Sequence, residues 1–225
     1  MMGVSFPVGT IVRTGAERAT LVRRTYSLVF VSILFTVAGA MFALSQPAIL
    51  NAVAAHPWIS MLATFAPLFL ALRAQNVFPA NIGLVLLFTF AEGVFLAPLL
   101  YVYGQQQPGL ITQAALTTIG AFGTLTAYAF ISRRDFSAWG SFFAVGLWVV
   151  IGSMLLNMFF FKNPGLQVAI AAVTVLVFSG LLVYDTWRIR NVYSPDEYVG
   201  AAVRIYLDLL NMFLAILRIF GGRRS

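Results

Sequence analysis

Residues 166–188 read LQVAIAAVTVLVFSGLLVYDTWR, and this stretch decides the fold of the chain. No charged residue occurs from 166 to 184, so the run is long enough to cross the ~30 Å hydrocarbon layer of a bilayer as one helix. The run is continuous and does not alternate between apolar and polar residues, which favours a helix over a strand of a membrane barrel. One acid, Asp185, nevertheless lies near its end. The stretch therefore predicts a membrane-spanning helix that carries an acidic group.

The rest of the chain has the same character. Of its 225 residues, 60% are hydrophobic and 9% are charged, whereas a soluble domain has roughly 25% charged residues. Such a chain cannot cover itself with a polar surface, so we expect the lipid bilayer to be its solvent and main partner. The net charge of +7 comes from cations at the ends of apolar runs, where they set topology and contact lipid headgroups. No basic patch has interleaved aromatic residues, which excludes nucleic acid as a partner. Cysteine is absent, which excludes disulfides and Cys-based metal sites.

Polar and turn-forming segments divide the chain into seven apolar runs. Gln46-Pro47 and His56-Pro57 bound the first of these segments, which we interpret as a loop. The sequence predicts an all-α, polytopic integral membrane protein with a seven-helix transmembrane bundle. The bundle forms a single transmembrane domain over residues 1–225, and residues 1–25 are a short cytoplasmic N-terminal segment. The predicted spans are 26–44, 58–74, 80–103, 110–131, 137–161, 166–188 and 200–220. The first run is longer than the core of a signal peptide, so we interpret it as a retained span, with cleavage near 43–45 as the alternative.

The distribution of cations orients the bundle. With the N-terminus in the cytoplasm, ten of the fourteen cations lie on the cytoplasmic side, in agreement with the positive-inside rule. The exceptions include Arg218, Arg223 and Arg224, which lie outside if the last segment crosses the membrane. We expect this segment to cross, and a re-entrant segment that returns is the alternative. The ten cytoplasmic cations are Arg13, Arg18, Arg23, Arg24, Arg73, Arg133, Arg134, Arg188, Arg190 and Arg204.

Two aspartates occupy the last two predicted spans. Asp185 lies near the cytoplasmic end of the sixth span, and Asp208 lies near the cytoplasmic start of the seventh. Because these spans run antiparallel across a short loop, both carboxyl groups are expected at a similar depth. Two carboxylates in a low-dielectric site cannot both ionise cheaply, so the pair is expected to share one proton. The pair is a candidate pH sensor and, if water reaches it, a candidate cation site. Exposure of Asp185 to water at a helix end is the alternative.

Four other polar residues in the spans are candidates for a functional role. Arg73 ends the second span on the cytoplasmic side and could pair with the two aspartates; the alternative is an ordinary snorkelling anchor. Glu92 lies in mid-span, where an ionisable group costs ~2.5–3.5 kcal/mol on insertion scales, so it is a candidate pore or interhelical polar group. Asn211, one turn after Asp208, and Asn157 in the fifth span are candidates of the same kind.

Three segments carry a pattern that resembles a known family. Residues 182–186 read LVYDT, and residues 205–214 read IYLDLLNMFL, followed by LRI at 217–219. Residues 88–98 read FTFAEGVFLAP. Through these segments the chain resembles the Bax inhibitor-1 family, also called the transmembrane Bax inhibitor motif family, in the form of a bacterial member. The number and orientation of the predicted spans agree with this resemblance over nearly the whole chain.

The resemblance implies a pH-sensitive calcium leak channel in the bacterial inner (plasma) membrane. It implies that Asp185 and Asp208 form the pH sensor that gates the channel, and that Arg73 is the latch. Calcium would be the permeant or transiently bound ion, with the two aspartates as its ligands, and protons would regulate the channel. No tightly bound cofactor is implied. Some relatives lack an acid at the position of Glu92, which argues against an essential part for Glu92 in gating.

Two other functions remain open. The resemblance is also compatible with a membrane-embedded regulator that binds a membrane protease or a death-pathway partner. An intramembrane aspartyl protease likewise places two aspartates in neighbouring spans. Such proteases carry Gly-x-Gly-Asp at the second aspartate, whereas bulky residues, 205–207, precede Asp208 here. The chain has one His, no Gly-x-Ser-x-Gly and no glycine-rich phosphate loop, so we expect no enzymatic activity.

Overall fold

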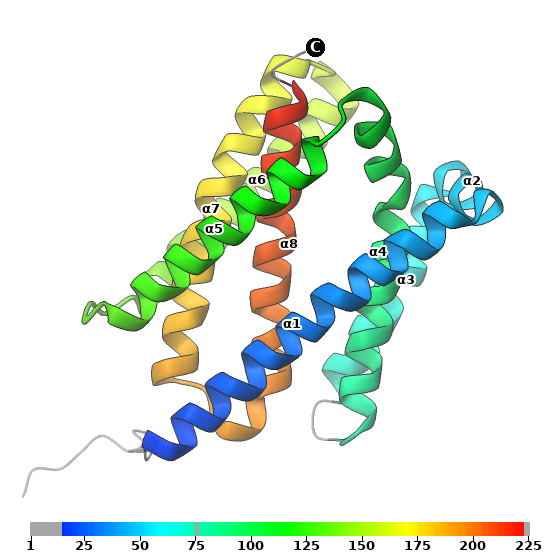
Figure 1. Ribbon diagram of the computed structural model, residues 1–225. Coiled ribbons are helices and arrows are strands. Elements are labelled where there is room, and N and C mark those ends of the chain that lie inside the picture. The colour runs from blue at the N-terminus through cyan, green and yellow to red at the C-terminus, as the bar shows by residue number, and fades with distance from the viewer. Residues whose placement is uncertain (1–14, 75–76, 223–225) are drawn as a thin grey trace, which may run out of the picture.

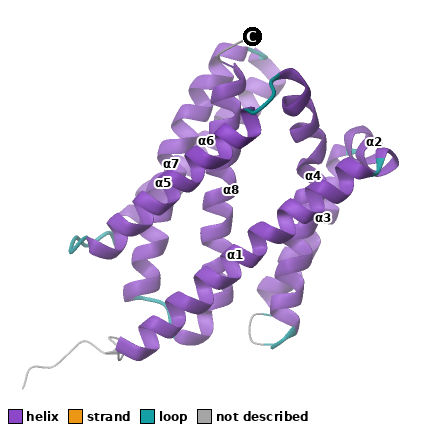
Figure 2. Ribbon diagram, in the orientation of Figure 1, coloured by secondary structure: helices purple, strands orange, loops and turns teal. Residues whose placement is uncertain are grey.

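The computed structural model of the protein describes residues 15–74 and 77–222, and these are helical almost throughout, without a strand (Figure 2). The predicted all-α class is thereby confirmed. Arg13, Arg223 and Arg224 lie outside the described residues. The main helices are α1 (Gly15–Ser45), α2 (Pro47–Ala55), α3 (Pro57–Arg73), α4 (Ala80–Gln106), α5 (Leu110–Ile131), α6 (Trp139–Leu156), α7 (Pro164–Asn191) and α8 (Tyr198–Gly222). A π-helical turn, η1 (Asn157–Phe161), extends α6, and a 3₁₀ turn, η2 (Pro195–Glu197), precedes α8.

The helices have the length and composition of membrane spans. Among the described residues, six helices are long and apolar enough to cross a bilayer, and α2 with α3 is a further candidate span, bent by 102°. The chain is therefore a polytopic helical membrane protein. Helix α2 corrects the expectation of a loop in this region. Pro47 and Pro57 do not bound a loop but begin helices, because the N–H group that proline lacks has no intrahelical partner in the first turn.

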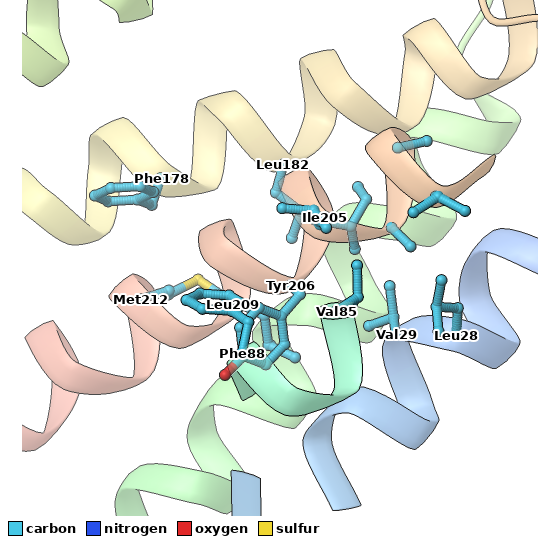
Figure 3. Packing of buried hydrophobic residues seen from close by; sticks show 14 of the residues in the cluster. Leu28, Val29, Val85, Phe88, Phe178, Leu182, Ile205, Tyr206, Leu209 and Met212 are labelled. Atoms are coloured by element: carbon cyan, nitrogen blue, oxygen red, sulfur yellow. The ribbon is translucent and has the colours of Figure 1, made fainter. Parts of the chain in front are cut away.

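Helix α8 forms the centre of the bundle. In the most apolar stretch of α8, 56% of the residues are buried, compared with 11% in the corresponding stretch of α6 with η1. Helix α8 packs against α7, α1, α5 and α4 and runs through the middle of the molecule (Figure 1). Side chains of α8 such as Met212 lie between those of α7 and α4 (Figure 3). The helix is unbroken from Tyr198 to Gly222, which favours a crossing segment over a re-entrant one.

The outer surface of the bundle is apolar. Helix α6 and turn η1 present large side chains such as Phe142, Trp148 and Phe160, each at least 70% exposed. In water such a surface would drive aggregation, but in a bilayer these side chains face lipid tails. The exposed surface thus supports the assignment of these helices as spans.

Helices α1 and α4 cross at close range through two glycines. A Cβ atom added to Gly93 would overlap the backbone of Thr36 and Ala40, and one added to Gly39 would overlap the backbone of Phe90. Small residues at such crossings let helix backbones approach and pack in the membrane, where no hydrophobic effect drives association. This crossing fixes α4, and Glu92 with it, against α1.

Candidate functional site

The two aspartates lie together, buried between α7 and α8. Asp185 is 6% exposed and Asp208 is 5% exposed. Asp185 lies near the end of α7, and Asp208 lies in the third turn of α8, after a short connection between the two helices. Since α7 and α8 pack along each other, the antiparallel arrangement brings both carboxyl groups to a similar depth.

The two carboxyl groups act directly on each other. Each carboxyl group lies close enough to the other to influence its ionisation. A carboxylate can only accept a hydrogen bond, so a bond between two carboxyl groups requires a proton on one of them. Oδ2 of Asp208 is buried and makes no hydrogen bond within the described residues. The geometry therefore fits a pair that holds one proton between two acids.

Two arginines from the same helices act on this pair. Nη1 of Arg188 lies 3.5 Å from Oδ1 of Asp185, one turn away on α7. Arg204, one turn before Asp208 on α8, is exposed but acts electrostatically on both aspartates. A cation near a carboxyl group favours its ionised form, whereas burial disfavours that form. The ionisation of the pair is thus set by a balance between burial and these two cations.

The connection between α7 and α8 is short and well fixed. Ser194 and Glu197 form a capping box at η2, in which the carboxylate of Glu197 accepts hydrogen bonds from the backbone N–H (2.6 Å) and the hydroxyl (2.8 Å) of Ser194. The backbone N–H of Tyr193 donates to the carbonyl of Arg188. These bonds fix the end of α7 and the start of η2, so the connection has a defined conformation.

Tyr193 packs in this connection beneath Arg188. The guanidinium carbon of Arg188 lies 4.5 Å from the centre of the Tyr193 ring, close enough for a cation–π contact. Burial raises the pKa of Tyr193 to about 12. The phenol is therefore neutral over the physiological range and does not itself respond to pH there. Its ring instead helps to position Arg188 beside Asp185.

Hydroxyl pairs join α1 to both aspartate-bearing helices. The hydroxyls of Tyr26 on α1 and Thr186, next to Asp185, are 3.1 Å apart. The hydroxyls of Thr36 on α1 and Tyr206, two residues before Asp208, are 2.7 Å apart. A rotation of α7 or α8 that altered the aspartate pair would also strain these bonds, so α1 is mechanically connected to the pair.

Glu92 lies on α4, in the interior of the bundle. It is 6% exposed, and its Oε2 makes no hydrogen bond within the described part of the chain. Glu92 acts electrostatically on Tyr206. The structure thus places Glu92 beside α8, near Tyr206, in an environment without the arginines that surround the aspartates.

Three other predicted residues take separate positions. Arg73 lies in the last turn of α3 and is exposed, and its part as a latch stays a prediction. The amide of Asn211 donates to the carbonyl of Leu207 in its own helix, at 2.8 Å. The side chain of Asn157 binds the backbone of Asn163 at both its amide nitrogen and its oxygen. Asn157 therefore shapes the α6–α7 turn, at the opposite end of the bundle from the aspartates (Figure 1).

Sequence reasoning missed the residues that surround the pair. Arg188 follows Asp185 by three positions, and Arg204 precedes Asp208 by four. Residues at these spacings are neighbours on a helix surface, so this signal could have found both arginines. Tyr26, Thr36 and Tyr206 carry no such signal, because their contacts join residues at least 160 positions apart.

The pair offers oxygen atoms to a cation but not a complete cage. Ca²⁺ takes 6–8 oxygen ligands, and the described residues contain no group of three His, Cys, Asp or Glu side chains that could hold a metal. Asp185 and Asp208 could therefore provide only some of the ligands that such an ion requires.

These features define a class of protein: a polytopic helical membrane protein with a buried acidic pair between its last two helices. The model of the family described as "Inhibitor of apoptosis-promoting Bax1" matches residues 18–225. The chain is 34% identical to "Bax inhibitor 1" of Schizosaccharomyces pombe, over 91% of this chain and 77% of that protein. It therefore belongs to the Bax inhibitor-1 family, as its motifs predicted.

Relatives occur in animals and in bacteria. The chain is 29% identical to "Protein lifeguard 4" of Mus musculus, over 89% of this chain and 84% of that protein. It is 34% identical to an uncharacterized protein of Campylobacter jejuni, over 93% of this chain and 91% of that protein. The similarity thus covers 77–91% of the length of these relatives, and the family match over residues 18–225 includes both aspartate-bearing helices.

Proposed function

We propose that this protein is a pH-sensitive calcium leak channel gated by Asp185 and Asp208. The observation that carries the proposal is the buried pair itself: two acids, 6% and 5% exposed, that act on each other at the contact between α7 and α8. Ionisable groups inside a membrane are costly and are functional candidates by default. The bacterial relatives support the inner (plasma) membrane of a bacterium as its location.

Protonation would change the contact between the two helices. With one shared proton, a hydrogen bond links Asp185 to Asp208, and the remaining negative charge is balanced by Arg188 and Arg204. Loss of that proton replaces the hydrogen bond with repulsion between two carboxylates, and gain of a second proton releases the arginines. Either change shifts an equilibrium between closed and open arrangements of α7 and α8.

Calcium is the cargo in this proposal rather than a resident metal. Carboxylate oxygens are the hard ligands that Ca²⁺ prefers, and Asp185 and Asp208 would serve as transient ligands while the ion passes. Arg73, at the end of α3, would act as a further latch when the pair is ionised. Glu92 and Asn211 would be polar groups along or beside the path.

Calcium flux into liposomes, measured against pH on the purified protein, tests the proposal. The wild-type protein should conduct calcium at a rate that changes with pH. An Asp185→Asn, Asp208→Asn double variant should lose this pH dependence, because neither amide titrates. Asp135→Asn, in the exposed loop between α5 and α6, is the matched control and should keep the wild-type profile. An unchanged pH profile in the double variant would contradict the proposal.

The names of relatives favour a second candidate, a membrane-embedded regulator of a protein partner. The relatives include "Bax inhibitor 1" and a "Golgi anti-apoptotic protein" of vaccinia virus. Under this alternative the protein would bind and restrain a membrane protease or a death-pathway protein. Specific binding of such a partner, together with no calcium flux in liposomes of the pure protein, would favour the regulator over the channel.

A further inference from the structure

We propose that the cavity between the end of α6 and helices α7 and α8 binds the phosphate headgroup of an anionic phospholipid. The cavity has a volume of about 440 Å³, within the range of ~300–1,000 Å³ that is usual for small-molecule sites. It lies at the end of the bundle where α6 passes into α7 and where α8 ends, opposite the aspartate pair (Figure 1). The proposal does not depend on calcium transport.

The charges of the cavity are complementary to a phosphate. The residues that line it include two cations, Lys162 and Arg218, and none of the described lining residues is acidic. Lys162 is exposed in the α6–α7 turn, and Arg218 is half-buried in the last turns of α8. An ammonium and a guanidinium from different elements can thus bind one anion together. The amide of Gln167 adds a polar group to the same wall.

The turn that carries Lys162 has a defined geometry. Lys162 has a positive φ of 48°, and its backbone N–H donates to the carbonyl of Asn157 at 2.7 Å. The side chain of Asn157 binds the backbone of Asn163. The side-chain Oδ1 of Asn163 in turn accepts hydrogen bonds from the backbone N–H groups of Gly165 and Leu166 at the start of α7. Lys162 therefore lies in a turn whose conformation is stabilised by hydrogen bonds within that turn.

The surroundings of the cavity favour a lipid over a soluble anion. Leu155 and Met158 line the cavity and are 46% and 47% exposed. The neighbouring aromatic side chains at 159–161 are 58–76% exposed, which is expected of a surface in contact with lipid tails. An anion that binds here would thus have cations on one side and hydrocarbon on the other. A phospholipid has this arrangement of groups and a free phosphate does not.

The site also accounts for the position of Arg218. On the predicted topology this arginine lies on the side that the positive-inside rule leaves poor in cations. A cation at that end of α8 does not add to the positive-inside asymmetry. Binding of a lipid phosphate gives it a partner in the membrane interface, together with Lys162.

Native mass spectrometry of the full-length protein in detergent tests the proposal, with phosphatidylglycerol and phosphatidylcholine of matched acyl chains as probes. Phosphatidylglycerol should bind more tightly than phosphatidylcholine. Each of Lys162→Gln and Arg218→Gln should weaken that binding about fivefold, as expected for one cation near an anionic headgroup, and the double variant should weaken it further. Lys162→Arg, which keeps the charge, should bind as the wild type does.

Two controls separate this site from general electrostatic attraction and from misfolding. Arg134→Gln removes a cation from the exposed loop between α5 and α6 and should leave lipid binding unchanged. Lys162 is itself exposed, so its substitution should leave the unfolding temperature at the wild-type value. Equal binding of the two lipids, or wild-type binding by the double variant, would overturn the proposal. Binding of inorganic phosphate alone as tightly as phosphatidylglycerol would also overturn it, by assigning the site to a soluble anion.

Discussion

The buried acids of this protein lie in two regions that differ in what surrounds them. Between α7 and α8, Asp185 and Asp208 act on each other and are influenced by Arg188 and Arg204. On α4, Glu92 lies near the hydroxyl of Tyr206, and its Oε2 makes no hydrogen bond within the described residues. The first region holds charges that can exchange partners when a proton arrives or leaves. The second region, which holds Glu92, lies beside the close backbone crossing of α1 and α4. The described residues there offer Glu92 no such exchange of charged partners. Burial of an acid alone therefore does not define a switch.

The largest expected effect concerns the rigidity of the Glu92 region. Gly93→Ala should lower the free energy of unfolding by about 1–3 kcal/mol, as overpacking does, because the added Cβ overlaps the backbone of α1. Thermal unfolding of the purified protein measures the effect. Gly120→Ala on α5 is the matched control, since a Cβ added there meets nothing within 4 Å. Equal stability of the two variants would show that the crossing is not tightly packed.

The next effect concerns the cations beside the aspartate pair. Arg204→Gln should move the pH midpoint of calcium flux upward by about one pH unit, because an adjacent cation favours the ionised form of a carboxyl group and its loss lets the proton remain at higher pH. Arg188→Gln should give a smaller shift in the same direction, since Arg204 acts on both aspartates whereas Arg188 acts on Asp185 alone.

Tyr193→Phe is the control for the arginine variants. The pKa of Tyr193 is raised to about 12 by burial, so the substitution removes no charge at physiological pH, and it preserves the ring that packs under Arg188. Its flux profile should match that of the wild type. A midpoint that stays in place in Arg204→Gln, or that moves as far in Tyr193→Phe, would contradict the part assigned to the arginines.

The smallest effect is expected at Glu92. Glu92→Gln should move the pH midpoint by less than about half a unit, because no aspartate or arginine of the gate is among the groups that act on it. The same liposome assay measures this. A shift as large as that of Arg204→Gln would place Glu92 in the gate and remove the distinction between the two regions.

The fold could be predicted closely from the sequence because the bilayer imposes a simple rule. A long uncharged run must satisfy its own backbone hydrogen bonds, and only a helix does this within one segment. The exception is α2, which is too short to span a membrane. Pro47 and Pro57 are compatible with either a loop or the start of a helix, and the packing of α2 against α4 decides between them.

The site could be predicted only in part. The positions of Asp185 and Asp208 followed from the antiparallel order of two adjacent spans, which is local information. The partners of the site depend on which faces of distant helices meet. The contact between Thr36 and Tyr206, 170 positions apart, is of this kind. Arg188 and Arg204 are different, because their helical spacing from the aspartates was visible in the sequence.

The short connection between α7 and α8 makes the pair of helices a lever. Asp185 lies six residues before the end of α7, about 9 Å from the connection at ~1.5 Å per residue, whereas the whole helix is about 40 Å long. If α7 pivots as a rigid rod at the capping box, a displacement of the carboxyl group is magnified roughly fourfold at the far end of the helix. That far end borders the cavity of Lys162 and Arg218. A small displacement of Asp185 relative to Asp208 would therefore appear as a larger movement at the opposite end of the bundle.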